Sequence, residues 1–282
     1  MIQKENNKID IDQAWHQLYA RLEQDELLPE EATAKKTKLF HRPVIRWAAA
    51  IIVLCVSIAT GWILSGNADS NLLTLHNEKG SVTLVTTLED GSIVYLSDDT
   101  QLRYPEHFDS QKREVLLKGN ALFDVSGNSN HPFLIETEFI RVEVIGTAFN
   151  VQSTDNNPFE LSVQRGEVKV THKESGESLH VKAGETATLL SNRLQIEQTS
   201  ENKEIDSFTG QIRFKDERLS DILTVINKRS SGIMLQATES LKDRQLTVTF
   251  DNESPEAIAN LICIAFNLSC KKEMNVLLIS EP

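Results

Sequence analysis

One apolar segment constrains this chain more than any other feature. Ala48–Leu64 reads AAAIIVLCVSIATGWIL, which is 17 consecutive residues without a charged side chain. With its two flanking residues, the run approaches the ~20 apolar residues that a helix needs to cross a bilayer core. Trp47 and Trp62 lie near its ends, where amphipathic rings favour the membrane interface. We therefore predict one transmembrane helix over residues 47–65.

Two other interpretations fit less well. A buried core helix would carry a polar residue on each turn, and this segment has only Ser57 and Thr60. A cleaved signal peptide would place a shorter apolar region within about the first 15–30 residues, whereas more than forty residues come first here. The membrane anchor is the favoured interpretation, and a cleaved signal is the next alternative.

The charges around this segment predict its orientation. Basic residues precede it, at Lys35, Lys36, Lys38, Arg42 and Arg46. Between Ser65 and Asn77 there is no Lys or Arg, and Asp69 is the only charged residue. Because Lys and Arg are enriched on the cytoplasmic side of a membrane, we expect a cytoplasmic N-terminus and an extracytoplasmic C-terminal region.

The N-terminal segment, residues 1–46, carries an amphipathic helix pattern. Ile11, Trp15, Leu18 and Leu22 recur at helical spacing, with Tyr19 beside them. A single helix cannot bury its own apolar face, so this face must contact a partner, the membrane surface or another copy of the chain. Interfacial helices favour Lys and Arg opposite the apolar face. Residues 1–31 instead carry eight acidic and three basic residues, which favours a protein partner.

Residues 66–207 read as an all-β domain. Short alternating runs such as Val82/Leu84 and Val94/Leu96 recur, separated by turn glycines. Asp90-Gly91 between two such runs is a strong hairpin signal, since Gly accepts a positive φ. Many short strands without a helical period are typical of a sandwich, a roll or a solenoid, and the pattern does not decide among them.

Residues 208–282 change to a mixed pattern, which predicts a small α+β domain. Strands are expected at 212–214, 233–235, 246–250 and 276–278, and helices follow the first and third of them. Ser254 is the expected cap of the second helix and Pro255 its first residue. Its apolar face is expected to contain Ile258, Leu261, Ile262, Ala265 and Phe266. The strand–helix–strand scheme occurs twice, which indicates a weak internal duplication.

The sequence contains no recognisable catalytic or metal-binding motif. Phosphate-binding loops, dinucleotide fingerprints, His-Glu-x-x-His and Gly-x-Ser-x-Gly are absent, and the seven histidines are scattered. The net charge of −12 disfavours nucleic acid as a partner, because phosphate contacts need clustered Lys and Arg. We therefore expect neither catalytic residues, metal ligands nor a cofactor, and interpret the chain as a binding protein rather than an enzyme.

Two of the three cysteines, Cys263 and Cys270, lie close together near the C-terminus, while Cys55 lies in the apolar segment. An extracytoplasmic domain would expose the pair to an oxidising compartment. Seven residues along one continuous helix is too far for a disulfide, so a bond requires a sharp turn after Asn267. Two partly buried thiols are the favoured alternative.

Several segments resemble FecR-type domains. They are residues 87–96 (TLEDGSIVYL), 113–125 (REVLLKGNALFDV), 132–133 (PF), 142–151 (VEVIGTAFNV), 163–168 (VQRGEV) and 183–185 (AGE). Residues 208–282 look like the C-terminal domain that accompanies FecR domains in Bacteroidetes-type proteins, which is similar to the short N-terminal domains of secretins and TonB-dependent transducers.

The resemblance implies a function in cell-surface signalling. Such proteins are inner-membrane anti-sigma factors that hold an extracytoplasmic-function (ECF) sigma factor in the cytoplasm. Their periplasmic part senses a TonB-dependent outer-membrane transducer, and a regulatory protease is a further partner where release is proteolytic. The competing hypothesis is a membrane-anchored periplasmic carbohydrate-binding or enzymatic β-domain, which predicts an exposed aromatic platform or convergent carboxylates.

Two groups of residues are candidate binding sites under the signalling interpretation. Trp15, Leu18, Tyr19 and Leu22 form the stripe expected to bind the sigma factor, in helix-in-groove fashion. Leu246, Val248 and Phe250 mark the strand expected to bind the transducer, because edge strands offer unpaired N–H and C=O groups.

Overall fold

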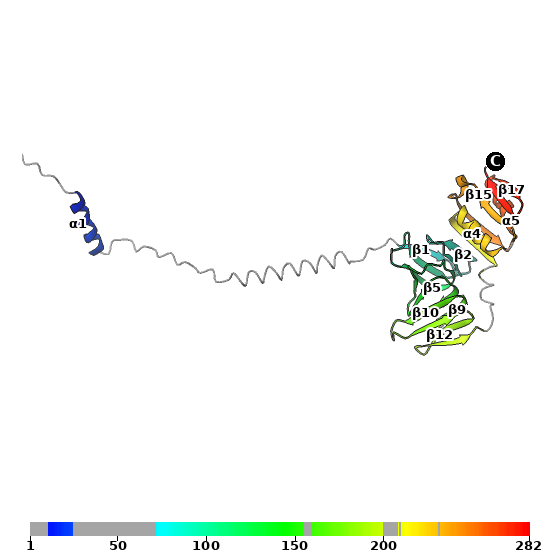
Figure 1. Cartoon of the computed structure of the whole chain (residues 1–282), viewed down its shortest axis with the longest axis horizontal. Coiled ribbons are helices and arrows are strands. Elements are labelled where there is room, and N and C mark those ends of the chain that lie inside the picture. Colours follow the sequence, from blue (N-terminus) through cyan, green and yellow to red (C-terminus); the bar gives the residue numbers. More distant parts are fainter. Residues whose placement is uncertain (1–10, 25–71, 155–158, 200–207, 209, 231) are drawn as a thin grey trace, which may run out of the picture. The chain divides into compact units, whose positions relative to one another are not determined.

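The computed structural model describes residues 11–24, 72–154, 159–199, 208, 210–230 and 232–282 (Figure 1). The predicted transmembrane segment, residues 47–65, lies outside the described residues. Among the helices that are described, none is both long enough and apolar enough to cross a membrane. The chain divides into two compact units, Met1–Gly66 and Asn67–Pro282, which we describe separately.

The first unit contains helix α1, Ile11–Gln24, where the apolar spacing predicted a helix. Asp12 lies in its first turn and Arg21 in its last turn. Both charges complement the helix dipole, which is positive at the N-terminus and negative at the C-terminus.

The second unit begins with a β-region of thirteen described strands. Their bounds are β1 Leu72–Asn77, β2 Thr83–Thr87, β3 Ile93–Leu96, β4 Thr100–Pro105, β5 Arg113–Asp124, β6 Phe133–Glu136, β7 Ile140–Val144, β8 Ala148–Ser153, β9 Glu160–Arg165, β10 Glu167–His172, β11 Ser178–Lys182, β12 Glu185–Leu190 and β13 Arg193–Gln198. The all-β prediction for this part of the chain is confirmed, and Asp90-Gly91 forms the β2–β3 hairpin turn.

Strand β5 belongs to two sheets, which together form a sandwich. Its first half pairs with β4 and β6 in a sheet of order β1-β4-β5-β6-β7-β10-β11. Its second half pairs with β3 and β8 in a sheet of order β13-β12-β9-β8-β5-β3-β2. Gly119 lies at the crossing, with a φ of +121°, and a Cβ there would lie 2.5 Å from the Thr100 hydroxyl oxygen. A side chain at position 119 would therefore clash with Thr100 where β5 crosses from one sheet to the other.

The apolar sides of the two sheets meet in one core. Phe123 of the second sheet stacks on Phe149 with ring centroids 5.5 Å apart, and it meets Phe133 of the first sheet edge-to-face at 6.3 Å. All three rings are fully buried. The alternating residues that predicted the strands supply this core, because successive side chains in a strand point to opposite faces.

The C-terminal region contains the predicted duplication of strand, helix and strand. Its elements are β14 Gln211–Arg218, α4 Leu219–Arg229, β15 Met234–Ala237, the 3-10 helix η1 Glu239–Leu241, β16 Gln245–Asp251, α5 Pro255–Phe266, β17 Ser269–Glu273 and β18 Val276–Ser280. Helix α5 begins as predicted: the Ser254 side chain accepts a hydrogen bond from the Ala257 N–H at 3.3 Å, and Pro255 follows the cap. Strand β17 was not predicted.

The core-facing side of α5 differs from the prediction at two positions. Leu261 and Ala265 are exposed, whereas the buried side consists of Ile258, Ala259, Ile262 and Cys263. The helix is apolar nearly all round, so periodicity alone did not identify which side meets the core.

The C-terminal region extends the second sheet of the sandwich. Strand β14 pairs in parallel with β2, with Ile212 opposite Thr83 and Phe214 opposite Val85, and β16 pairs with its other edge. Strands β15, β18 and β17 form a separate sheet. A second apolar core joins residues of both regions, including Ile93 and Tyr95 from the sandwich and Ile222 from α4.

Candidate interaction sites

Helix α1 presents apolar side chains to solvent within its own unit. The exposed fractions of Trp15, Leu18 and Tyr19 are 55%, 47% and 59%. Leu22 falls within the helix, but its side chain lies outside the described residues. At about 100° per residue, Trp15, Leu18 and Tyr19 lie on one side of the helix and Gln17 lies on the other. This stripe is the arrangement that the sequence predicted for a partner-binding helix.

Strand β16, predicted to bind a transducer, is the outermost strand of its sheet among the described residues. Leu246 and Phe250 are buried in the second core, and Val248 packs against it. The three predicted side chains therefore anchor the strand rather than face a partner. The parts of β16 that a partner could contact are its backbone edge and the face turned away from the core. That face carries the exposed side chains of Thr247 and Thr249.

A β-bulge shapes the strand beside this edge. The β14–β16 register shifts between Phe214 and Glu217, and Asp216 has a φ of +53°. The Thr247 hydroxyl donates to the Asp216 carboxylate at 3.0 Å and accepts from the Asp216 N–H at 3.0 Å. These bonds hold Asp216 in a conformation that L-residues seldom adopt, and bulges of this kind are frequent at sheet edges.

Glu217 follows the bulge and lies against strand β2. Burial raises the pKa of the Glu217 carboxyl to about 7, an effect that hydrogen bonds to the Thr86 side chain and the Thr87 backbone partly offset. The nearby Asp221 carboxylate raises this pKa further. A titratable group therefore lies at the junction between the sandwich and the C-terminal region.

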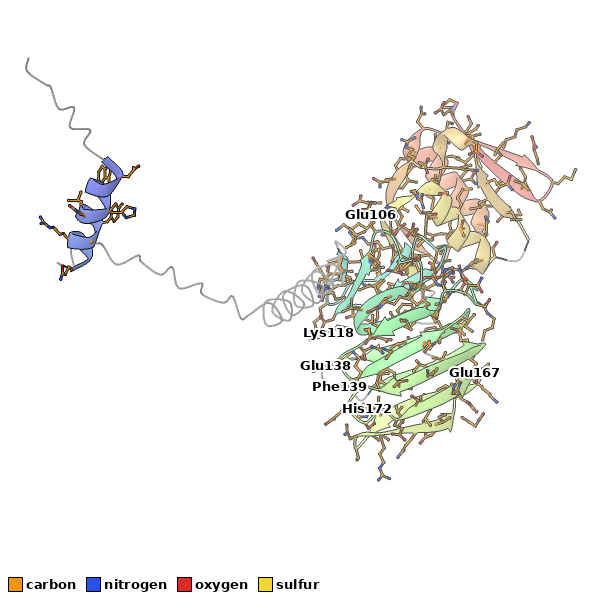
Figure 2. All side chains as sticks on the ribbon, turned by 60° about the vertical axis from the view of Figure 1, so that its left-hand side comes forward. Glu106, Lys118, Glu138, Phe139, Glu167 and His172 are labelled. Atoms are coloured by element: carbon orange, nitrogen blue, oxygen red, sulfur yellow. The ribbon has the colours of Figure 1, made fainter. Side chains whose placement is uncertain are left out.

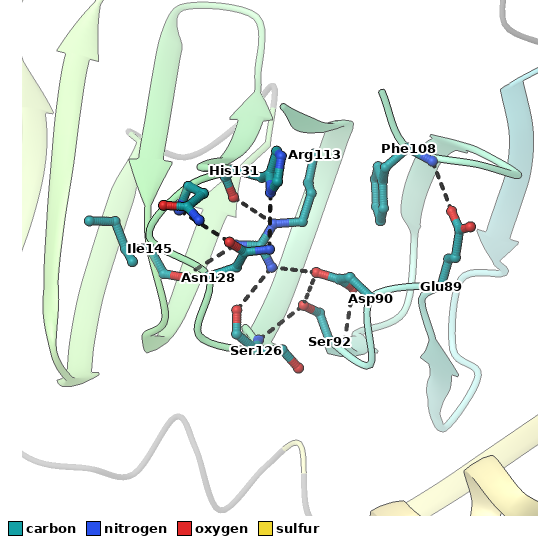
Figure 3. A network of polar contacts seen from close by, with 10 residues as sticks. Glu89, Asp90, Ser92, Phe108, Arg113, Ser126, Asn128, His131 and Ile145 are labelled. Carbon is teal, nitrogen blue, oxygen red and sulfur yellow. Dashed lines mark hydrogen bonds and ion pairs between the residues drawn. The ribbon is translucent and has the colours of Figure 1, made fainter. Parts of the chain in front are cut away.

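A buried polar network surrounds Arg113 at the start of β5 (Figure 3). Its Nη1 donates to Asp90 Oδ2 at 2.5 Å and to the Ser126 carbonyl at 2.9 Å. Its Nε donates to the His131 carbonyl at 2.9 Å and its Nη2 to the Ile145 carbonyl at 3.2 Å. One guanidinium group thus binds three loops that are far apart in the sequence.

The partners of Arg113 are tied to one another. The Ser92 hydroxyl donates to the Asp90 carboxylate at 2.7 Å and accepts from the Ser126 N–H at 3.1 Å. The guanidinium carbon also lies 5.4 Å from the centre of the Phe133 ring. Because the guanidinium donates four hydrogen bonds to groups of the chain itself, the network stabilises the fold. The FecR-like motifs contain Asp90 and Arg113, but only the three-dimensional structure pairs them.

A groove of about 710 Å³ opens on the side of the sandwich where Figure 2 labels Lys118, Glu138 and Phe139. It tests the competing carbohydrate-binding or enzymatic hypothesis. Phe139 is 53% exposed, whereas the other lining aromatic residue, Phe159, is buried. A single exposed ring does not make a stacking platform.

Acid–base catalysis commonly uses a pair of carboxyl groups, and the described lining contains two, Glu136 and Glu138. Glu136 Oε2 lies 2.7 Å from Lys173 Nζ, and Arg141 binds the other oxygen. Although burial opposes the effect, hydrogen bonds to Lys173 and Arg141 lower the pKa of Glu136. Glu136 is therefore a carboxylate held in ion pairs. In the part of the chain that the structure describes, no cluster of three or more His, Cys, Asp or Glu side chains is arranged to hold a metal ion.

The fold and its buried network define a β-sandwich module to which a small α+β region is joined. The family described as FecR protein matches residues 77–169, which include Asp90, Arg113 and all their partners in the network. The match confirms the resemblance over this segment: residues 77–169 of the chain are a FecR domain.

Two solved structures are similar to the chain. Both are of a provisionally assigned anti-sigma factor from Parabacteroides distasonis ATCC 8503, and each is 23% identical to this chain. They cover 75% and 74% of this chain and 99% of their own, with TM-scores of 0.47 and 0.46. No match was found among curated proteins.

Proposed function

We propose that this chain is a single-pass anti-sigma factor of the inner membrane. Residues 1–46 bind an ECF sigma factor in the cytoplasm, residues 47–65 cross the membrane, and residues 66–282 sense a TonB-dependent outer-membrane transducer in the periplasm. The FecR domain supports the regulatory class. The observation that carries the proposal is the exposed apolar stripe of α1, since a helix of this kind needs a partner.

The proposed contact with the sigma factor is a helix in an apolar groove. Trp15, Leu18 and Tyr19 are large and lie side by side, as anchors of such complexes do. Aromatic anchors often supply a large share of binding energy, and truncating one at a hot spot costs on the order of 2 kcal/mol or more. The sigma factor would be released in one of two ways: by a conformational change that passes from the periplasmic region through the membrane segment, or by proteolytic cleavage of the chain.

The proposed contact with the transducer is strand addition at β16. An outer strand can pair its free N–H and C=O groups with a strand from a partner. Thr247 and Thr249 are exposed on the face away from the core, so a partner could reach this side without disturbing Leu246 and Phe250. The neighbouring bulge and Glu217 place this edge close to the junction with the sandwich.

Co-purification of an ECF sigma factor with the full-length chain, solubilised in detergent, tests the proposal. The Trp15→Ala, Leu18→Ala double variant should reduce the bound sigma factor at least 10-fold, from an anchor contribution of about 2 kcal/mol. Gln17→Ala is the matched control, because Gln17 is exposed on the opposite side of α1. Equal amounts of sigma factor bound to both variants and to the parent would reject α1 as the binding site.

A further inference from the structure

Cys263 and Cys270 meet at the corner where α5 is followed by β17. Cys263 lies near the end of α5 and is 6% exposed, while Cys270, in β17, is half-buried and packs against the same core. Asn267 ends the helix with a φ of +53°, and the Leu268 N–H donates to the Cys263 carbonyl at 2.8 Å. This is the sharp turn that a disulfide requires. It brings Cys270 back towards Cys263, and the two thiols interact with each other.

We propose that Cys263 and Cys270 form an intramolecular disulfide that fastens the end of α5 to β17. The proposal rests on the proposed topology, because disulfides persist in oxidising compartments such as the periplasm. The oxidant is a disulfide-bonded thiol oxidoreductase or, in a test tube, glutathione disulfide.

The reaction proceeds by two thiol–disulfide exchanges. The Cys270 thiolate attacks the oxidant's disulfide, which forms a mixed disulfide and releases one thiol of the oxidant. The Cys263 thiolate then attacks the Cys270 sulfur, which closes the intramolecular bond and releases the second thiol. The two cysteines lose two protons and two electrons, and the electrons reduce the oxidant's disulfide to two thiols.

Burial determines which cysteine reacts first. Burial raises the pKa of the Cys263 thiol to about 12, and its interaction with Cys270 acts in the same direction. Since the thiolate is the nucleophile, Cys263 is a poor first attacker. Cys270 is more accessible, so an oxidant meets it first.

The test uses the full-length chain with Cys55→Ala, so that Cys263 and Cys270 are the remaining cysteines. The protein is equilibrated with an oxidising glutathione mixture, free thiols are blocked with N-ethylmaleimide, and the intact mass is measured. The expected product carries no maleimide adduct and has lost the mass of two hydrogen atoms. After reduction it should carry two adducts, and its melting temperature should fall by several degrees.

A relocated cysteine is the matched control. Ser269 precedes Cys270 in β17 and is exposed, and neighbouring side chains of a strand point to opposite faces. The variant Ser269→Cys, Cys270→Ser keeps two cysteines but should retain two free thiols. Two adducts on the parent under oxidising conditions, or equal closure of the relocated pair, would overturn the proposal.

Alkylation in living cells separates this proposal from the proposed topology. The same strain carries a periplasm-dependent reporter fused after Asn71. An active reporter with both cysteines alkylated overturns the disulfide and leaves the topology standing. A silent reporter overturns the topology, and with it the disulfide in the cell. An active reporter with both cysteines protected supports both.

Discussion

Asp90 has two structural roles, one in the β2–β3 turn and one in an ion pair with Arg113, and only the first can be predicted from the sequence around it. The Asp90-Gly91 dipeptide predicts a turn, and the structure shows that turn between β2 and β3. The same carboxylate also pairs with the buried Arg113. A buried guanidinium left without its carboxylate is strongly destabilising. The pairing was not readable from the sequence because the two residues are 23 positions apart and meet only after β5 is in place.

Neutralising Asp90 should therefore destabilise the FecR domain. Asp90→Asn keeps the size and turn preference of the side chain but leaves the Arg113 charge unpaired. We expect the free energy of unfolding to fall by about 3 kcal/mol, measured by denaturant titration. Asp243→Asn is the control, since Asp243 is 89% exposed and lies 4.0 Å from Arg218. A loss for Asp90→Asn no larger than that for the control would show that the pair does not stabilise the fold.

Glu217 should make stability depend on pH. The folded chain holds its proton with a pKa of about 7, above the ordinary 4.5, mainly because of burial. The contribution of this group to stability is therefore fully present below about pH 4.5 and is lost as the pH rises through about 7. Glu217→Gln should match the parent near pH 4.5 and exceed its stability near pH 8 by about 3 kcal/mol. Thermal unfolding at a series of pH values measures this difference.

The matched control for Glu217 is Glu239→Gln, because the Glu239 side chain is 87% exposed. It should leave the pH profile of the parent unchanged. If Glu217→Gln retains the parent's profile as well, the pH dependence arises from other groups.

At the scale of elements, local chemistry predicted helix α5 but not strand β17. Ser254 and Pro255 form a readable start signal, and the structure begins the helix there. Strand β17 reads SCKKE, with no alternation of apolar residues, and its polar side chains are exposed. Strand β17 forms because all five of its residues pair with β18. Pairing with a neighbouring strand can outweigh the low strand propensity of a polar sequence. The pairing of β14 with β2 could not be predicted from the sequence either, because more than a hundred residues separate the two strands.

Strand β16 provides the test at this scale. Thr249→Lys places a charge on the exposed face of an outer strand, where lysines oppose the addition of another strand. We expect the variant to fold normally and to lose at least 10-fold in affinity for the transducer's periplasmic domain, measured by calorimetry. His180→Lys adds the same residue to β11, an outer strand of the other sheet, and should bind as the parent does. Equal binding by both variants would exclude the β16 edge.

At the scale of the whole second unit, the C-terminal region and the sandwich depend on each other. Val85, Ile93, Tyr95 and Leu122 of the sandwich are buried in the core that they share with α4 and α5. Asp124 adds an ion pair to Lys228 of α4 at 3.0 Å. Deleting residues 208–282 would expose these apolar side chains, so degradation of such a truncation does not identify a signalling role. Single substitutions at β16 separate signalling from stability more cleanly.

The topology of the chain is the prediction on which the whole proposed function depends. Five basic residues precede Ala48–Leu64 between positions 35 and 46, and none follows before Asn77, so the N-terminus should remain in the cytoplasm. Alkaline phosphatase fused after Asn71 should be active, and fused after Phe40 it should be inactive. A cytoplasmic reporter at the same two positions should give the opposite pattern. Exchanging the charges, by Arg42→Glu and Arg46→Glu with Asn67→Lys and Asn71→Lys, should lower phosphatase activity at the distal site. An inactive phosphatase after Asn71 in the parent would place the FecR domain in the cytoplasm and contradict periplasmic sensing.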